Sequence, residues 1–215
     1  MSDRDITIIG GGWSVLNLAL DRLCGRVIAV NDSAILAPRW DYAVSMDRLW
    51  VEHRIDQVVI RSTETSPPRE IWLRPSALQN LTHYVAAWPW VRSFECDHQS
   101  NIFSAMTGRL NGTNSGFCAL NLAWQLRPSR VFLLGFDMNR DPHGRAYWYP
   151  PYPWVAAQNG GATTNGKYTK WSKEFRGAAT SFHRINCKVF NVSPASAIDV
   201  FPKITPAEYL RETRC

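Results

Sequence analysis

Several features that would assign this chain to a familiar class of protein are missing from its sequence. No run of residues reaches the roughly 18 apolar positions of a membrane-spanning helix, so we expect no transmembrane segment. The first residues, MSDRDITIIGGGW, lack the charged start and long apolar centre of a signal peptide. These two absences predict a cytoplasmic protein.

Cysteines are few and show no motif. The five of them are scattered along the chain, and none forms a CxxC pair. This pattern predicts neither a disulfide framework nor a zinc site, and we expect buried or incidental thiols. The aspartates likewise lack the spacing of metal ligands, so we expect no metal and no bound cofactor.

Charge is present without clustering. The net charge is +6 and the isoelectric point is about 9.2, yet no run of Lys or Arg occurs. The positive balance favours anionic partners such as nucleotides, phosphates or nucleic acid, but does not by itself indicate a DNA-binding protein. At 215 residues and 45% hydrophobic composition, the chain can form one α/β domain with a sizeable core.

The most informative stretch is Asn111–Met138. It begins with a small polar loop around Ser115 and Gly116, continues with apolar residues at helical spacing, and stops at Pro128. Val131–Leu134 then reads as a buried parallel strand that ends at Gly135 and Asp137. A loop at a helix N-terminus favours an anion, and the strand brings a carboxylate to the same edge, as in a nucleotide site.

Three earlier strands end in glycine or polar clusters. Asp5–Gly10 runs into a glycine-rich turn and then an apolar helical pattern, although the dinucleotide fingerprint GxGxxG is incomplete. Arg26–Val30 and Asp41–Met46 are the next two strands. In a parallel sheet these ends share the ligand-binding edge. The clusters are Gly10, Gly11, Gly12 and Ser14, then Asn31, Asp32 and Ser33, then Asp47.

The remaining elements are less clear. We expect a brief helix at Trp50–Ile55, a strand at Gln57–Arg61 and an edge strand at Glu70–Leu73. A long helix at Thr169–Ile185 and a last strand at Lys188–Val192 follow later. Thr205 would then cap a short C-terminal helix whose first residue is Pro206.

The segment 139–168 is long, without periodicity, and rich in aromatic residues. Long segments of this kind inside compact domains are usually active-site lids, and disordered segments are usually poor in aromatics. We therefore predict a single Rossmann-like α/β domain over residues 1–215. It would have a mostly parallel sheet, helices on both faces, an irregular insertion at 62–104 and an aromatic-rich lid at 139–168 after the Gly135–Asp137 strand.

The motifs GGGWS, VIAVNDS, NSGFCALNLA, LLGFDM and NVSPASAIDVFP occur in an order that resembles a known family. They are similar to the glycosyltransferase family 42 sialyltransferases and the related flagellin-glycosylation and pterin-pyrophosphokinase-like proteins. The closest similarity is to the small versions found in phages and prophages. The resemblance covers roughly residues 5–48 and 111–202; if the gene belongs to a phage, the location would be the host cytoplasm.

The resemblance implies that a cytidine nucleotide sugar binds at the carboxyl edge of the sheet. A second family Asn aligns near Asp47, and a family Arg falls at Gly112, with Arg109 the nearest substitute. Tyr147 is the best match to the family tyrosines that contact phosphate. The nucleotide-binding residues implied are Gly10, Gly11, Gly12, Ser14, Asn31, Asp32, Asp47, Asn114, Ser115, Gly116 and Tyr147.

The family's histidine base would align near Thr169, where this sequence has no histidine. His143 and His183 are the nearest histidines. A general base must reach the hydroxyl that it activates, and His143 on the expected lid is a candidate. Asp137 and Asp47 are further candidates.

The function predicted from the resemblance is a metal-independent, sialyltransferase-like glycosyl transfer from a nucleotide sugar, with CMP as the expected nucleotide. The acceptor would be a glycan or a modified phage DNA base. Two alternatives stay open: a non-catalytic nucleotide-binding module, and a magnesium-dependent (pyro)phosphoryl transferase that would need carboxylates at Asp47 and Asp137.

Overall fold

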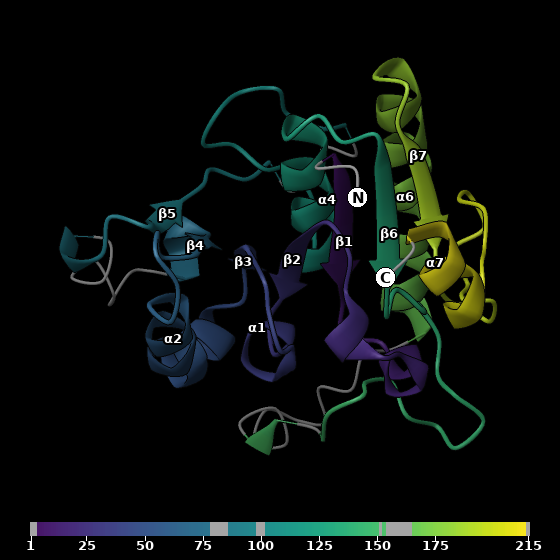
Figure 1. The fold of residues 1–215 in the computed structure, drawn as a ribbon, viewed down its shortest axis with the longest axis horizontal. Helices are drawn as coiled ribbons and strands as arrows, with labels where there is room; N and C mark the ends of the chain where they lie inside the picture. Colours follow the sequence, from purple (N-terminus) through teal and green to yellow (C-terminus); the bar gives the residue numbers. More distant parts are fainter. Residues whose placement is uncertain (1–3, 78–85, 98–101, 151, 154–164, 214–215) are drawn as a thin grey trace.

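The computed structural model describes residues 4–77, 86–97, 102–150, 152–153 and 165–213. Its centre is a seven-stranded sheet in the order β5-β4-β3-β2-β1-β6-β7, in which every neighbouring pair is parallel (Figure 1). The strands are β1 (Asp5–Ile9), β2 (Arg26–Val30), β3 (Tyr42–Ser45), β4 (Glu70–Leu73), β5 (Val91–Ser93), β6 (Arg130–Leu134) and β7 (Lys188–Asn191).

The strand order reverses between β1 and β6. From β1 the chain builds outward to β5, then returns to place β6 on the other side of β1, with Ile9 opposite Leu134. Parallel sheets bind ligands outside the carboxyl ends of the strands at such a reversal, because the connections leave in opposite directions and open a crevice. The glycine turn after β1 and the Gly135–Asp137 turn after β6 meet there.

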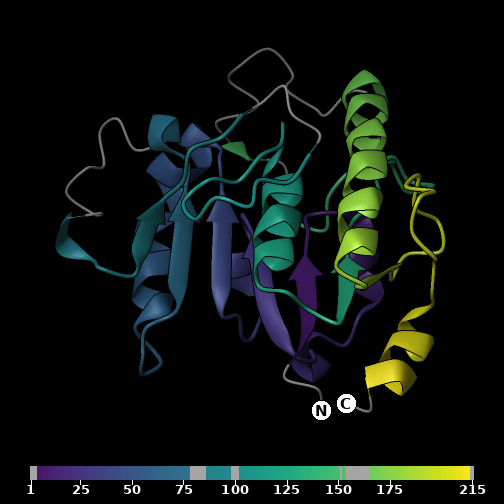
Figure 2. The same cartoon turned by 90° about the horizontal axis from the view of Figure 1, so that it is seen from above.

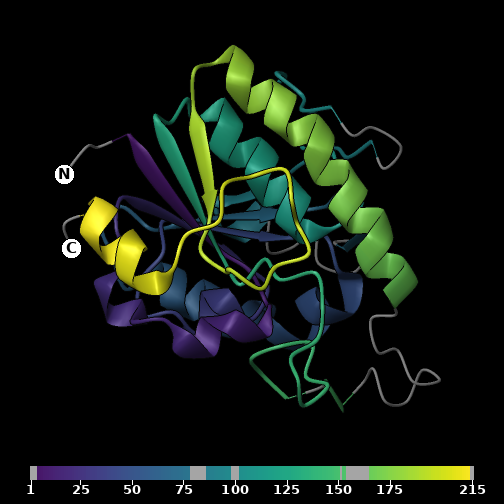
Figure 3. The same ribbon diagram turned by 90° about the vertical axis from the view of Figure 1, so that its right-hand side faces the viewer.

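Helices cover both faces of the sheet (Figures 2 and 3). The first face carries α4 (Ser115–Gln125) and α6 (Asn165–Arg184), and its core includes Phe117, Phe175 and Phe182. The second face has a core around Trp40 and Trp50. The elements of that second face are the 3-10 turns η1 (Trp13–Asn17) and η2 (Leu20–Arg22) and the helices α1 (Ser33–Leu36), α2 (Arg48–Ser62) and α7 (Pro206–Thr213). The two cores confirm the predicted α/β class.

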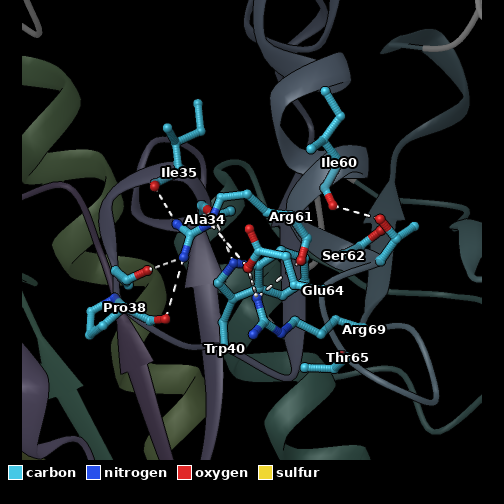
Figure 4. Close-up of polar contacts among 12 residues, drawn as sticks. Ala34, Ile35, Pro38, Trp40, Ile60, Arg61, Ser62, Glu64, Thr65 and Arg69 are labelled. Carbon is cyan, nitrogen blue, oxygen red and sulfur yellow. Dashed lines mark hydrogen bonds and ion pairs between the residues drawn. The ribbon is translucent and has the colours of Figure 1, made fainter.

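A half-buried arginine fixes the short helix α1, which follows the end of β2. The Arg61 guanidinium, on α2, donates to the carbonyl oxygens of Ala34 (3.2 Å), Ile35 and Ala37 (2.8 Å), as Figure 4 shows in part. These carbonyls are the ones that the end of a four-residue helix leaves without partners in the helix itself. Arg61 therefore holds the end of α1 in place.

Two predictions about local structure were wrong. The apolar pattern after the glycine turn forms only the 3-10 turns η1 and η2, and the strand predicted at Gln57–Arg61 is the last part of α2. α2 continues through this segment because Ile55, Val58 and Val59, which are buried, occur at helical spacing. Helical burial thus overrides the strand preference of β-branched residues.

The segment 62–104, which we expected to be irregular apart from a strand at Glu70–Leu73, adds two strands to the sheet, and β4 has the predicted bounds. β4 is not an edge strand, because the three-residue β5 pairs outside it. β5 is too short to show a periodic pattern. The capping prediction at Thr205 is confirmed, since its hydroxyl accepts from the Glu208 amide at 3.2 Å and the Glu208 carboxylate accepts from the Thr205 amide at 2.7 Å.

The cysteines mostly match the expectation of incidental thiols. Cys96, Cys118 and Cys187 form no disulfide. Cys24 differs, because it is disulfide-bonded.

Candidate functional site

A cavity of about 1310 Å³ lies at the carboxyl ends of β1 and β6. It exceeds the ~300–1,000 Å³ typical of small-ligand pockets, so it has room for a ligand of two parts. Of the site residues predicted from the sequence, all but Ser14 and Asp32 line it. The predicted residues that line it are Gly10, Gly11, Gly12, Asn31, Asp47, Asn114, Ser115, Gly116, Asp137, His143 and Tyr147.

Backbone forms the floor of the cavity, and each glycine of the turn is required by a different neighbour. A Cβ at Gly10 would lie 2.7 Å from the Gly135 carbonyl oxygen, and one at Gly12 would lie 2.3 Å from the Asp137 carboxylate. A Cβ at Gly11 would lie 2.9 Å from the Tyr149 hydroxyl oxygen. The glycines therefore allow the β1 turn, the β6 turn and the aromatic segment to approach closely.

Asp137 is a buried junction between three turns. Its carboxylate accepts from the Ser14 amide at 2.9 Å and from the Ser193 hydroxyl at 2.6 Å, while its side chain and backbone together are only 1% exposed. Its backbone carbonyl accepts from the Ala197 amide at 2.7 Å. Both carboxylate oxygens thus hold the β1 turn and the turn after β7, which explains why Ser14 lies behind the cavity wall.

In the turn after β2, Asn31 points into the cavity and Asp32 lies in the core. Asn31 lines the cavity with φ of 52°, a conformation that Asn tolerates better than most residues, and its Oδ1 is buried without a hydrogen-bond partner among the described residues. Asp32 lies in the core, where it accepts from the Trp50 indole at 2.7 Å and faces Arg54 at 3.8 Å. Burial raises the pKa of Asp32, while Trp50 and Arg54 oppose that rise.

The ends of β3 and the start of α4 form the opposite wall. Asp47 caps α2 by accepting from the Trp50 amide at 3.1 Å, and it stays exposed to the cavity. Asn114 caps α4 through the Phe117 amide at 2.9 Å, and Ser115 accepts from the Met46 amide at 3.1 Å. The start of α4 thus lies at the cavity, where the Glu174 carboxylate accepts from the amide and the hydroxyl of Thr113.

The aromatic segment after β6 packs directly on the glycine turn. Tyr147 forms a bridge to Gly12, and the Trp148 amide donates to the Gly11 carbonyl at 3.3 Å. The rings of Tyr147 and Tyr149 stack at 5.2 Å, and Tyr149 stacks on Tyr152 at 5.2 Å. Burial raises the pKa values of Tyr149 and Tyr152, so both hydroxyls stay protonated at neutral pH.

His143 lies in an exposed turn at the rim of the cavity. Its backbone amide donates to the Asp141 carboxylate at 2.9 Å, which also accepts from the Arg145 amide at 2.7 Å and the Arg145 Nε at 2.6 Å. The buried Asp141 therefore fixes the turn that presents both the imidazole and the Arg145 guanidinium to the cavity.

Basic residues that we did not select from the sequence give the cavity its charge. The cavity is lined by the carboxylates of Asp47 and Asp137 and by five cationic side chains from three parts of the chain. Arg74 directly follows β4, so counting that strand among the inner ones would have identified it. The cations are Arg74, Arg140, Arg145, Lys167 and Lys170. The excess of positive charge favours a phosphate-bearing ligand.

Two other residues considered from the sequence do not line this cavity. Arg109 pairs with Glu95 at 2.6 Å, and His183 is exposed near the end of α6. His98 is outside the described residues. Tyr168 and Trp171, which the sequence analysis did not select for the site, line the cavity from the first turns of α6.

Within the described ranges, no group of three or more His, Cys, Asp or Glu side chains could hold a metal ion. None of the helices described here is long and apolar enough to cross a membrane.

The fold matches the α/β architecture of the sialyltransferases that the sequence motifs resemble. The α-2,3-sialyltransferase Cst-I from Campylobacter jejuni superposes with a TM-score of 0.61 and 13% identity, over 94% of this chain and 81% of that chain. The sialyltransferase CstII from the same organism, in complex with CMP-3FNeuAc, gives a TM-score of 0.59 and 14% identity, over 94% and 86%. The chain matches no protein-family model and no curated protein sequence. At these identities the likeness shows the fold.

Proposed function

We propose that this protein is a sialyltransferase-like glycosyltransferase that takes a nucleotide sugar, with CMP as the nucleotide, and needs no metal. The observation that carries the proposal is the large cationic cavity at the β1–β6 reversal, whose floor is backbone and whose rim carries hydroxyl and imidazole groups. The neighbouring folds support the choice of nucleotide, because structures of the sialyltransferase CstII contain CMP, in one case together with a trisaccharide acceptor.

Binding would use groups of known position. The phosphate would lie against the glycine turn after β1, and Asn31, whose Oδ1 has no partner in the described part of the chain, would accept from a nucleotide hydroxyl. Arg140 and Arg145 would neutralise the phosphate charge with the Tyr147 hydroxyl.

In the transfer step, the bond between the donor sugar's anomeric carbon and the phosphate oxygen breaks, and its electron pair leaves with CMP. The acceptor oxygen forms the new bond to that carbon and gives its proton to a base. We assign the base to His143, which is exposed at the rim, rather than to Asp137, whose two oxygens already accept from Ser14 and Ser193. The cations then stabilise the negative charge on the leaving phosphate.

The test is thermal unfolding with CMP, CDP, CTP, GDP, UDP and ATP, each with and without magnesium. A ligand that binds only the native state raises the melting temperature by mass action. We expect CMP to stabilise the protein without magnesium and a CMP-sugar to be hydrolysed or transferred. Stabilisation only by a triphosphate with magnesium would replace this proposal with phosphoryl transfer, and CMP binding without turnover of any CMP-sugar would leave a binding module.

The variant Asn31→Gly tests the nucleotide contact. Glycine accepts the φ of 52° as readily as Asn, so this change removes the amide without adding backbone strain. Loss of one neutral hydrogen bond should weaken CMP binding by about 3- to 10-fold. Unchanged affinity in the folded variant would exclude Asn31 from the nucleotide site.

A further inference from the structure

A second hollow lies beside the main cavity. It has a volume of about 440 Å³ and shares Met138, Arg140 and Tyr168 with its larger neighbour. Its other walls are the outer side of α6 and the turn that follows β7. The two hollows therefore meet at Arg140 and Tyr168, and a group bound in one would lie next to a group bound in the other.

Basic side chains dominate the second hollow. Arg140, Lys173 and Arg176 line it, and Asp199 is the one carboxylate among its lining residues in the described part of the chain. Arg176 pairs with Asp199 at 3.4 Å, on a surface where both side chains are mostly exposed. Lys173 forms no ion pair with any described residue. The hollow thus keeps an uncompensated positive charge.

Tyr168 supplies a second, independent sign of a ligand at the junction. The residue is only 7% exposed, yet its hydroxyl has no hydrogen-bond partner among the described residues. A buried hydroxyl without a partner is costly, so such groups usually meet a ligand or an ordered water. Burial raises the pKa of Tyr168 to about 12, which keeps the hydroxyl a donor at neutral pH.

We infer that the second hollow binds an acceptor sugar that carries a phosphate or carboxylate group beside its reacting hydroxyl. This inference rests on the proposed function for the meaning of "acceptor". The anion lies against Lys173 and Arg176, and the hydroxyl faces the main cavity past Tyr168 and Arg140. At 440 Å³ the hollow is near the lower end of ligand pockets, which suits one charged monosaccharide better than several nucleotides.

The charge change Lys173→Glu tests this subsite, with Lys188→Glu as its matched control. Both lysines are exposed, and Lys188 lies at the start of β7 and lines neither hollow. The two variants have the same net charge, so long-range attraction of anions is equal in them. Titration calorimetry would measure glucose, glucose 6-phosphate, glucuronate and a 12-residue oligothymidylate, each with and without CMP.

We expect the charged sugars to bind at least about 10-fold more tightly than glucose and to lose about 10-fold in Lys173→Glu. Lys188→Glu should match the unaltered protein, and CMP affinity should be the same in all three. The order of glucose 6-phosphate and glucuronate identifies which anion the subsite prefers. Equal binding of charged and neutral sugars, or equal losses in both variants, would overturn the inference.

Two results separate this inference from the proposed function. If charged sugars bind through Lys173 but the protein does not bind CMP, the subsite is supported and the CMP-dependent transferase is rejected. CMP binding together with no preference for charged sugars would keep the CMP-dependent transferase and reject the charged-sugar subsite. Oligothymidylate that binds more tightly than any sugar, with an affinity that falls steeply with salt, would replace the sugar subsite with a nucleic-acid surface.

Discussion

Truncation of Asp137 to Ala should destabilise the whole protein strongly, although the residue lies at the candidate site. The variant leaves the buried Ser14 amide without its 2.9 Å acceptor and removes the 2.6 Å contact with Ser193. An unsatisfied buried donor costs about 1–3 kcal/mol, and a hydrogen bond to a charged group is worth about 1.5–3 kcal/mol. We expect a loss of about 3–5 kcal/mol, which lowers the melting temperature by roughly 6–20 °C in a chain of this size.

Asp137→Asn distinguishes this structural role from a purely catalytic one. Its amide oxygen can still accept from Ser14 and its NH₂ can donate to Ser193, because a serine hydroxyl both donates and accepts. We therefore expect a smaller loss, about 1–2 kcal/mol, from the missing charge assistance. Urea unfolding of both variants would measure the difference, with Asp199→Ala, at an exposed position, as the control. Equal stability of Asp137→Ala and the unaltered protein would refute the argument.

Two further predictions concern the second face of the sheet. Burial raises the folded-state pKa of Asp32, so its contribution to stability is present below its unfolded pKa and lost as the pH rises through the folded value. Asp32→Asn keeps an acceptor for Trp50, so its stability relative to the unaltered protein should increase from pH 4 to pH 7 in urea unfolding; a constant difference would contradict this. Arg61→Ala removes the guanidinium donor from the carbonyls of Ile35 and Ala37, while Ala34 keeps the Trp40 indole as a donor at 2.8 Å, and should cost about 2–4 kcal/mol by the same assay. Arg48→Ala, an exposed change on the same helix, should stay within about 0.5 kcal/mol.

Five of the seven described strands, and the cavity at their carboxyl ends, were predictable because each signal was local. β1, β2, β3, β6 and β7 are short apolar runs followed by glycine or polar residues, and parallel pairing brings such ends to one edge. The fold likeness to sialyltransferases confirms the architecture that the motifs indicated. Phage origin and the relation to flagellin-glycosylation proteins stay predictions.

What the sequence could not show depends on contacts between distant segments. Asp32 and Asn31 are adjacent, yet one turns into the core because Trp50 and Arg54 of α2 surround it. Arg74 and Lys170 are ordinary surface residues by composition, and only the topology places both at the same cavity. The role of Asp137 as a junction requires Ser14 and Ser193, which approach it from opposite ends of the chain.

The backbone floor beneath the cavity has a consequence for how this protein can change. A side chain at Gly10 or Gly12 would place its Cβ less than 3 Å from a carbonyl oxygen or a carboxylate, so substitutions at these positions cannot change the floor of the cavity. Variation in ligand preference must instead arise at the side chains that line the rest of the cavity, such as Arg74, Arg140 and Tyr147. Directed evolution toward a new donor would therefore diversify these side chains and leave the glycine turn fixed.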